Sequence, residues 1–102
     1  MDNRKDKRFG KKLMVRIDSG TSYFSGIMSD VSQNGIFIRS DKDFAKDKVI
    51  NIELLLPYNT ISSLKGKVKR TMKIPGSNWL FGTGIELMEK DKIFHNLIKS
   101  IS

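Results

Sequence analysis

Six short segments with the composition of β-strands, each bounded by turn residues, constrain the fold of this chain more than any other feature. In the clearest of them apolar and polar residues alternate, which is the period of a strand with one buried face. Glycine, proline, asparagine and aspartate separate the segments, and no helical pattern lies between them. The predicted strands are residues 13–18, 21–32, 35–40, 49–57, 63–73 and 79–88.

The pattern changes after Lys90, where apolar residues recur at a helical spacing. These apolar positions are 93, 94, 97, 98 and 101. They predict a helix over residues 91–101 that covers an open end of the sheet. Strands without intervening helices favour an antiparallel barrel or sandwich, and a small barrel fits best. We therefore expect an all-β fold over residues 13–102, a six-stranded antiparallel Greek-key β-barrel with a C-terminal α-helix.

The chain of 102 residues is basic, with a net charge of +8 and a pI near 9.9. Residues 1–12 hold six basic and two acidic side chains, so we predict a flexible basic N-terminal arm there. This charge favours an anionic partner. Because the sequence shows no signal peptide and no apolar span, we expect a cytoplasmic protein that does not insert into membranes.

Several kinds of site are excluded by the residue types present. The chain has no cysteine and one histidine, His95, which rules out disulfides, thiolate metal sites and histidine clusters. Glu86 and Glu89 have no nucleophile or pocket signature nearby, and His95 lacks a catalytic partner. We therefore expect no metal, no cofactor and no enzymatic activity.

Two short motifs contain polar residues of the kind that bind ligands. Arg4 and Arg8 form an R-x-x-x-R motif in the arm, and Asp30, Ser32 and Gly35 form a D-x-S-x-x-G motif between two predicted strands. Each motif alone also has a simple explanation, because basic arms contain such spacings by chance and the loop residues are typical of a turn. Together, however, the two motifs fit one guanine nucleotide.

The chemistry of the two motifs is complementary. An arginine fork can bond to guanine O6 and N7, stack on the base or hold a phosphate. Asp30 can accept hydrogen bonds from guanine N1 and N2, which adenine does not offer in that arrangement. Ser32 can donate to a phosphate or a base edge, and Gly35 lets the backbone approach the ligand. A purine that lacks either set of groups would be rejected.

These motifs, with a last strand ending in GTGIEL, resemble the PilZ domain family over residues 4 to about 100. The resemblance implies a six-stranded β-barrel with a C-terminal helix that serves as a bacterial receptor for cyclic di-GMP. It also implies that Arg4 and Arg8 clamp guanine and phosphate, that Asp30 reads the base, and that Ser32 and Gly35 contact the ligand. The secondary ligand contacts that we expect are Lys5, Gln33, Asn34 and Gly84.

The arm suggests how such a receptor would signal. We expect the ligand to bridge arm and barrel, to order the arm with Phe9 against the barrel, and to present a new face to a downstream protein. The family sometimes uses extra arginines in the arm to hold a stacked pair of ligands. Their absence here leaves the number of ligands per site open.

The remaining aromatic and basic residues have simpler explanations. Trp79 and Phe81 begin the last predicted strand and, two residues apart, lie on the same face of it. We therefore expect both to pack in the core or at its rim. In the strand over residues 63–73, alternation places Arg70 on the inner face. It places Lys65, Lys67 and Lys69 on a cationic outer face that serves solubility or steers a ligand or partner.

Two other functions stay open. A small basic barrel can bind single-stranded nucleic acid by stacking bases on aromatic side chains, here Phe24, Phe37, Tyr58 and Trp79. The scattered positions of these aromatics argue against nucleic acid, because the specific polar groups concentrate in two motifs. The second alternative is a PilZ-like domain that binds no ligand and acts only as an interaction module.

Overall fold

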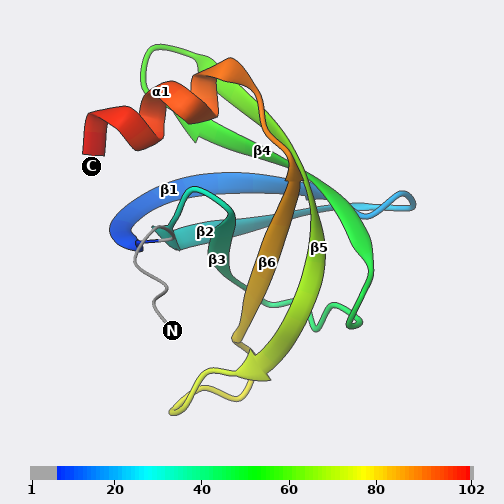
Figure 1. The fold of residues 1–102 in the computed structure, drawn as a ribbon. Coiled ribbons are helices and arrows are strands. Elements are labelled where there is room, and N and C mark those ends of the chain that lie inside the picture. Colours follow the sequence, from blue (N-terminus) through cyan, green and yellow to red (C-terminus); the bar gives the residue numbers. More distant parts are fainter. Residues whose placement is uncertain (1–6, 102) are drawn as a thin grey trace, which may run out of the picture.

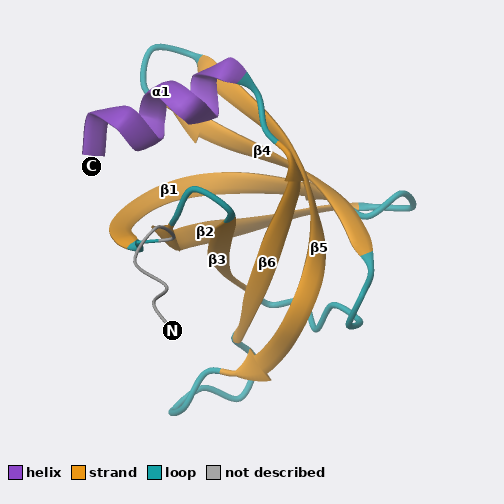
Figure 2. Cartoon of the chain, viewed as in Figure 1, coloured by secondary structure: helices purple, strands orange, loops and turns teal. Residues whose placement is uncertain are grey.

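The computed structural model describes residues 7–101, which form six strands and one helix (Figures 1 and 2). The strands are β1 (Phe9–Asp18), β2 (Tyr23–Val31), β3 (Gly35–Ser40), β4 (Val49–Leu56), β5 (Thr60–Lys73) and β6 (Phe81–Glu89), and the helix is α1 (Lys92–Ile101). Within the described part of the chain, no helix is long and apolar enough to cross a bilayer.

The strands close into a barrel in the order β1-β2-β3-β6-β5-β4, and every neighbouring pair is antiparallel. Three consecutive strands, β1 to β3, are followed by a longer connection that returns β4 to the side of β1. This order defines a Greek key. The predicted fold, a six-stranded antiparallel Greek-key barrel with a C-terminal helix, is therefore confirmed.

The core lies inside the barrel and is closed at its ends by two phenylalanines. Alternate residues of the strands point inward, as the sequence pattern predicts. Phe44, from the connection between β3 and β4, is buried and packs edge-on against Phe24. Phe94 of α1 is fully buried with Leu97, and α1 lies at the upper end of the barrel in Figure 1, away from the β5–β6 turn.

The first strand begins earlier than predicted, at Phe9 and not at Leu13. Phe9 pairs with Val31 and Gly10 pairs with Asp30 before the register shifts between Gly10 and Leu13. This bulge interrupts the alternation that marks the strand in the sequence. Phe9 also packs against the core. Residues 9–12, which the sequence assigned to the arm, therefore belong to the barrel.

A second bulge corrects the predicted position of Arg70. The register of β5 with β6 shifts between Val68 and Arg70, so Lys69 is an extra residue on β5. The side-chain alternation changes its phase there. Arg70 is consequently exposed on the outer face, whereas strict alternation from Leu64 placed it inside.

Trp79 also differs from the prediction. β6 begins at Phe81, and Trp79 lies before it in the β5–β6 turn, where it is 66% exposed. The backbone N–H of Trp79 donates to the hydroxyl of Ser77. The sequence placed Trp79 and Phe81 on the same face of one strand, but Trp79 lies in a turn before that strand. Of the two, only Phe81 is partly buried, at the rim of the core. The predicted helix over residues 91–101 is confirmed as α1, and His95 is exposed on it.

Candidate ligand-binding site

A cavity of about 490 Å³ lies on the outside of the barrel, where β3, β6 and β5 meet the start of β1 and the end of β2. It is lined by Arg8, Asp30, Asn34, Gly35, Phe37, Lys69, Arg70, Gly84, Ile85 and Glu86. A volume of this size falls in the range of small-molecule sites. Five of the lining residues were predicted from the sequence as contacts for cyclic di-GMP, namely Arg8, Asp30, Asn34, Gly35 and Gly84.

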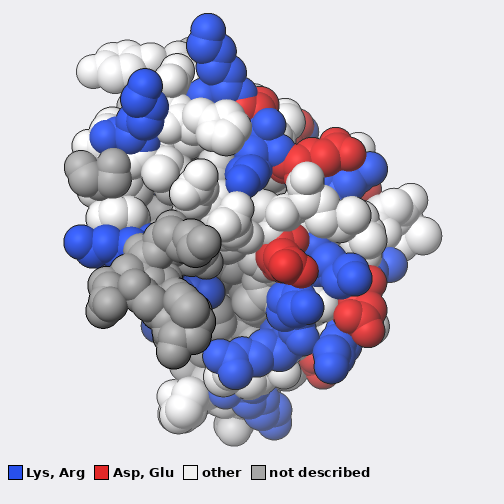
Figure 3. Space-filling view, viewed as in Figure 1, with Lys and Arg blue, Asp and Glu red and all other residues white. Residues whose placement is uncertain are grey.

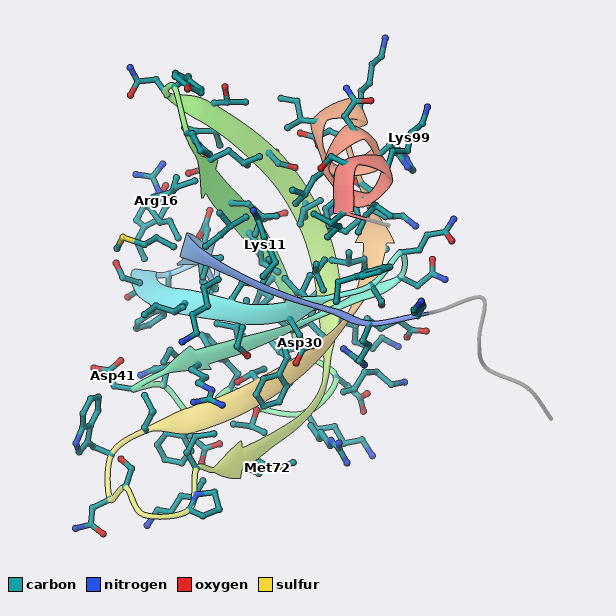
Figure 4. All side chains as sticks on the ribbon, turned by 90° about the vertical axis from the view of Figure 1, so that its left-hand side faces the viewer. Lys11, Arg16, Asp30, Asp41, Met72 and Lys99 are labelled. Carbon is teal, nitrogen blue, oxygen red and sulfur yellow. The ribbon has the colours of Figure 1, made fainter. Side chains whose placement is uncertain are left out.

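Arg8 and Asp30 meet at this cavity. Arg8 Nη1 donates to Asp30 Oδ1 across 2.9 Å, although 22 positions separate the residues. Pairing of β1 with β2 brings them together, because Gly10 lies opposite Asp30 in the register. In Figure 4, Asp30 accordingly lies close to β1. The predicted approach of the arm to the acidic loop is thus present at Arg8. The predictions for Arg4 and Lys5 lie outside the described residues.

Ser32 shapes the β2–β3 loop from within. It is fully buried, and its hydroxyl donates to the carbonyl oxygen of Gly35 at 3.3 Å. The backbone N–H of Ser32 donates to the same oxygen at 2.8 Å. Among the described residues, Ser32 and Gln33 are not part of the cavity lining. A direct contact of either residue with a ligand stays a prediction.

The two glycines at the cavity have different surroundings. A Cβ atom on Gly35 would lie 3.1 Å from the carbonyl oxygen of Ile85 and 3.9 Å from Arg8 Nη2. The close approach of β3 to β6 therefore accounts for glycine at position 35. A Cβ on Gly84 would meet only Arg70 Cγ, at 3.9 Å. Packing within the protein does not account for glycine at position 84, where a side chain would project into the cavity.

The sequence did not predict Phe37 or Arg70 as contacts for cyclic di-GMP, although Phe37 was among the aromatics considered for stacking in the nucleic-acid alternative. They flank Gly84 in one row across the sheet, because Phe37 on β3 and Arg70 on β5 both pair with it. Arg70 reaches this face only through the bulge on β5, which has no clear mark in the sequence. The half-buried ring of Phe37 could have been inferred from its outward parity in the strand 35–40, beside the loop motif.

Basic side chains gather around the cavity. Figure 3 shows Lys and Arg side chains over the lower part of β5 and β6. Of the predicted cationic face of Lys65, Lys67 and Lys69, only Lys69 lines the cavity. Lys69 lies 3.6 Å from the carboxylate of Glu86, which also lines it. The site thus combines two cations on β5 with the Arg8–Asp30 pair on the other side.

Lys90, between β6 and α1, is a further residue that the sequence did not single out. Its ammonium group donates to the carbonyl oxygen of Gln33 and to Asn34 Oδ1, both at 3.0 Å. The backbone N–H of Leu87 donates to the Asn34 carbonyl oxygen at 2.8 Å. These bonds hold the β2–β3 loop against the end of β6. An isolated lysine gives no sign in the sequence of such a contact.

Asp91 follows Lys90 and caps the helix. Its carboxylate accepts from the Phe94 backbone N–H at 2.9 Å, from the Ser62 hydroxyl at 2.7 Å and from the Ser63 N–H at 2.7 Å. Partial burial alone would raise the pKa of Asp91, but these hydrogen bonds favour the ionised carboxylate and leave its pKa below the ordinary value of 3.8. Asp91 therefore fastens α1 to β5.

Comparison with known proteins agrees with this fold and cavity. The model of the PilZ domain family matches residues 2–101. The chain belongs to the PilZ domain family. The PilZ fold is also seen in the solved structure of the Bacillus subtilis inhibitor of motility, MotI/DgrA, with a TM-score of 0.79. The sequences are 16% identical over 96% of this chain, so the likeness concerns the fold alone.

The match to MotI/DgrA covers 48% of that protein, so this PilZ chain spans about half of its length. No curated protein sequence matches the chain. The PilZ family is one of cyclic di-GMP receptors, and its domains are binding or adaptor modules. The resemblance expected over residues 4 to about 100 is confirmed.

Proposed function

We propose that this PilZ domain binds cyclic di-GMP in the cavity between Arg8, Asp30 and Gly84 and signals through a protein partner. The proposal rests on one observation. Arg8 and Asp30 lie 2.9 Å apart at the edge of a cavity in which Gly84 leaves open space. The family of the chain supports the choice of ligand.

Each group in the cavity has a role that its chemistry supports. Asp30 accepts from N1 and N2 of one guanine, and Arg8 bonds to the O6 and N7 edge or to a phosphate. Arg4, by the match to the family motif, completes the clamp. Lys69 and Arg70 on β5 supply positive charge for the phosphates. The backbone at Gly84 is open, so a flat ring can lie there between Phe37 and the guanidinium of Arg70.

The signal in this proposal passes through the start of the chain. Ligand held by Arg4 and Arg8 joins the segment before β1 to the barrel and orders it, which changes the surface that a partner meets. Hydrogen exchange of residues 3–8, which precede β1, should slow when cyclic di-GMP saturates the protein. Exchange that is unchanged at saturation would show that the ordering step does not occur.

Titration calorimetry with cyclic di-GMP tests the binding itself. Saturable binding is expected, and Arg8→Ala or Asp30→Ala should each weaken it by about 1–3 kcal/mol, the scale of a lost bidentate guanine contact. Arg16→Ala is the matched control, because Arg16 is an exposed arginine on β1 that, like Arg8, is paired with a carboxylate, here that of Glu53. The proposal fails if the parent does not bind, or if Arg8→Ala binds as tightly as Arg16→Ala.

The alternative of nucleic-acid binding finds no support in the positions of the aromatic residues. Phe24 packs on Phe44 at the core, and Phe37 lies at the cavity. Tyr58 lies in the β4–β5 turn and Trp79 in the β5–β6 turn. These rings do not form one stacking platform. The alternative of an interaction module without ligand predicts no heat of binding with cyclic di-GMP, so the same titration decides it.

A further inference from the structure

The outer face of the barrel carries a row of four exposed apolar side chains. Ile27, Met14, Leu55 and Ile61 come from β2, β1, β4 and β5, and they are 47%, 60%, 38% and 44% exposed. Met14 pairs with Ile27 on one side and with Leu55 on the other, and Leu55 pairs with Ile61. Paired residues on one face have Cβ atoms about 5 Å apart. The four residues therefore form one continuous apolar row.

Single apolar residues scattered over a surface need no explanation, but a contiguous group marks an interaction site. We propose that the apolar row is the docking site for an amphipathic helix of a partner protein, with acidic residues beside its apolar face. This proposal goes beyond ligand binding, because it concerns a surface on other strands of the barrel.

The shape of the surface favours a helix as the occupant. The barrel is closed, so among the described strands no edge is free to take up a partner strand by main-chain hydrogen bonds. The row crosses four strands, which spans about 14 Å at the usual strand spacing. A helix of about ten residues has the same length. Its own backbone is fully hydrogen bonded, so side-chain contacts suffice for docking.

The charges beside the row favour an acidic partner. Lys12 is exposed two residues before Met14, and Arg39 is exposed and paired in the register with Ile27. Neither has an ion pair with another described residue. On the other flank, Arg16 and Glu53 neutralise each other across 2.9 Å. The unbalanced charge at the margin of the row is therefore positive, as is the net charge of +8.

A second copy of this chain and a lipid surface fit the row less well. Another copy brings the same charge of +8, and its α1 has buried Phe94 and Leu97 and has no acidic residue in its first turn. A bilayer would have to cover the Arg16–Glu53 pair beside the row, and charged pairs lose much of their solvation in such a setting. A protein helix can leave that pair in water.

The row and the cavity are placed so that both can be occupied together. The cavity lies over β3, β6 and the middle of β5, and it reaches the start of β1 and the end of β2 at Arg8 and Asp30. The row crosses β2 and β1 away from these ends, at Ile27 and Met14, and continues over β4 to the start of β5. In Figure 4, Arg16 beside the row is well separated from Asp30 at the cavity. A partner on the row therefore does not block the ligand.

The test places the photo-reactive residue benzoylphenylalanine at position 14 of the full chain, in the cells that express it. The cross-linked segment is then sequenced by mass spectrometry. The expected product joins position 14 to another protein, at a segment with apolar residues three or four apart and an excess of Asp and Glu. Ile27→Asp or Leu55→Asp should lower the yield at least about tenfold, as for a lost hot spot. Asn78→Asp, at an exposed turn residue far along the chain, should not.

The other outcomes overturn the proposal. They are the absence of a product, a product with a second copy of this chain, a product with a basic segment, or a yield that Leu55→Asp leaves unchanged. Sedimentation with vesicles of phosphatidylglycerol and phosphatidylcholine that Leu55→Asp abolishes would identify a lipid surface and also overturn it. Unfolding curves and cyclic di-GMP titrations of each variant should match the parent, which separates this test from that of ligand binding.

Discussion

Lys90 Nζ lies 3.0 Å from the side-chain oxygen of Asn34, although 56 positions separate these residues in the chain. The same ammonium group donates to the carbonyl oxygen of Gln33. The β2–β3 loop, which contains Ser32 and lies between Asp30 on β2 and Gly35 on β3, is thereby fastened to the segment between β6 and α1. The neighbouring Asp91 caps α1, so the candidate binding loop and the helix share one anchor.

Replacing Lys90 by methionine should weaken cyclic di-GMP binding although Lys90 does not line the cavity. The loop loses two hydrogen bonds, each worth about 0.5–1.5 kcal/mol. A less firmly held loop should lower the affinity for cyclic di-GMP about two- to tenfold. Calorimetry measures the affinity. Lys92→Met, at an exposed lysine at the start of α1, is the control and should bind as the parent does. Equal affinities of the two variants would contradict a role of Lys90 in holding the loop.

Replacing Gly84 by leucine should abolish binding and leave the fold intact, because the new side chain has open space in the cavity. Replacing Gly82 by alanine should instead destabilise the fold. Its Cβ would overlap the ring of Phe37, which should cost about 1–3 kcal/mol of the free energy of unfolding. Urea unfolding and calorimetry on both variants give the comparison. Tight binding by Gly84→Leu would exclude the cavity as the site.

Arg70 should contribute through its planar guanidinium and not only through its charge. Arg70→Ala should weaken cyclic di-GMP binding by about 1–3 kcal/mol if the group stacks on or forks to the ligand. Arg70→Lys keeps the charge but not the plane, so it should recover little of the loss. Lys67→Ala, on the same strand outside the cavity, serves as the control. Full recovery in Arg70→Lys would reduce the role of Arg70 to general electrostatics.

Asp91 should make the stability of the domain sensitive to acid. Its pKa is below 3.8 in the folded protein, so its ionised form stabilises the fold fully above its unfolded pKa and loses this effect as the pH falls through the folded pKa. Asn is also a capping residue, but it lacks the charge and one of the two acceptor oxygens. Asp91→Asn should therefore be less stable than the parent at pH 7, by about 0.5–1.5 kcal/mol for a lost hydrogen bond. The difference between the two unfolding free energies should shrink as the pH falls below 3.8. A difference that stays constant over this range would mean that packing, not ionisation, explains the loss.

The fold could be predicted from the sequence because apolar alternation, turn residues and the helical stripe after Lys90 all agree. The errors lie where the local pattern is broken. Bulges after Gly10 and at Lys69 shift the side-chain parity, and a turn separates Trp79 from Phe81. Such irregularities depend on the partner strand, which a single sequence does not show.

The candidate site was predictable only where its residues lie in short motifs. Arg8 and Asp30 meet as the two motifs suggested. Phe37, Arg70 and Lys90 reach the cavity or its loop through pairing of β3 and β5 with β6 and through the path of the chain after β6. Their roles depend on contacts between segments that are far apart in the sequence, and no local spacing or motif predicts such contacts.

The ion pair between Arg8 and Asp30 has a consequence for selectivity. Arg8 already has the carboxylate of Asp30 at 2.9 Å, so a free phosphate ion must compete with that carboxylate for the guanidinium. When a ligand separates the pair, each group loses its hydrogen-bond partner. A molecule replaces both partners only if it has an acceptor for the guanidinium and donors for the carboxylate. In the proposed site, the Asp30 carboxylate would therefore compete with simple anions for Arg8, whereas a guanine would satisfy both groups.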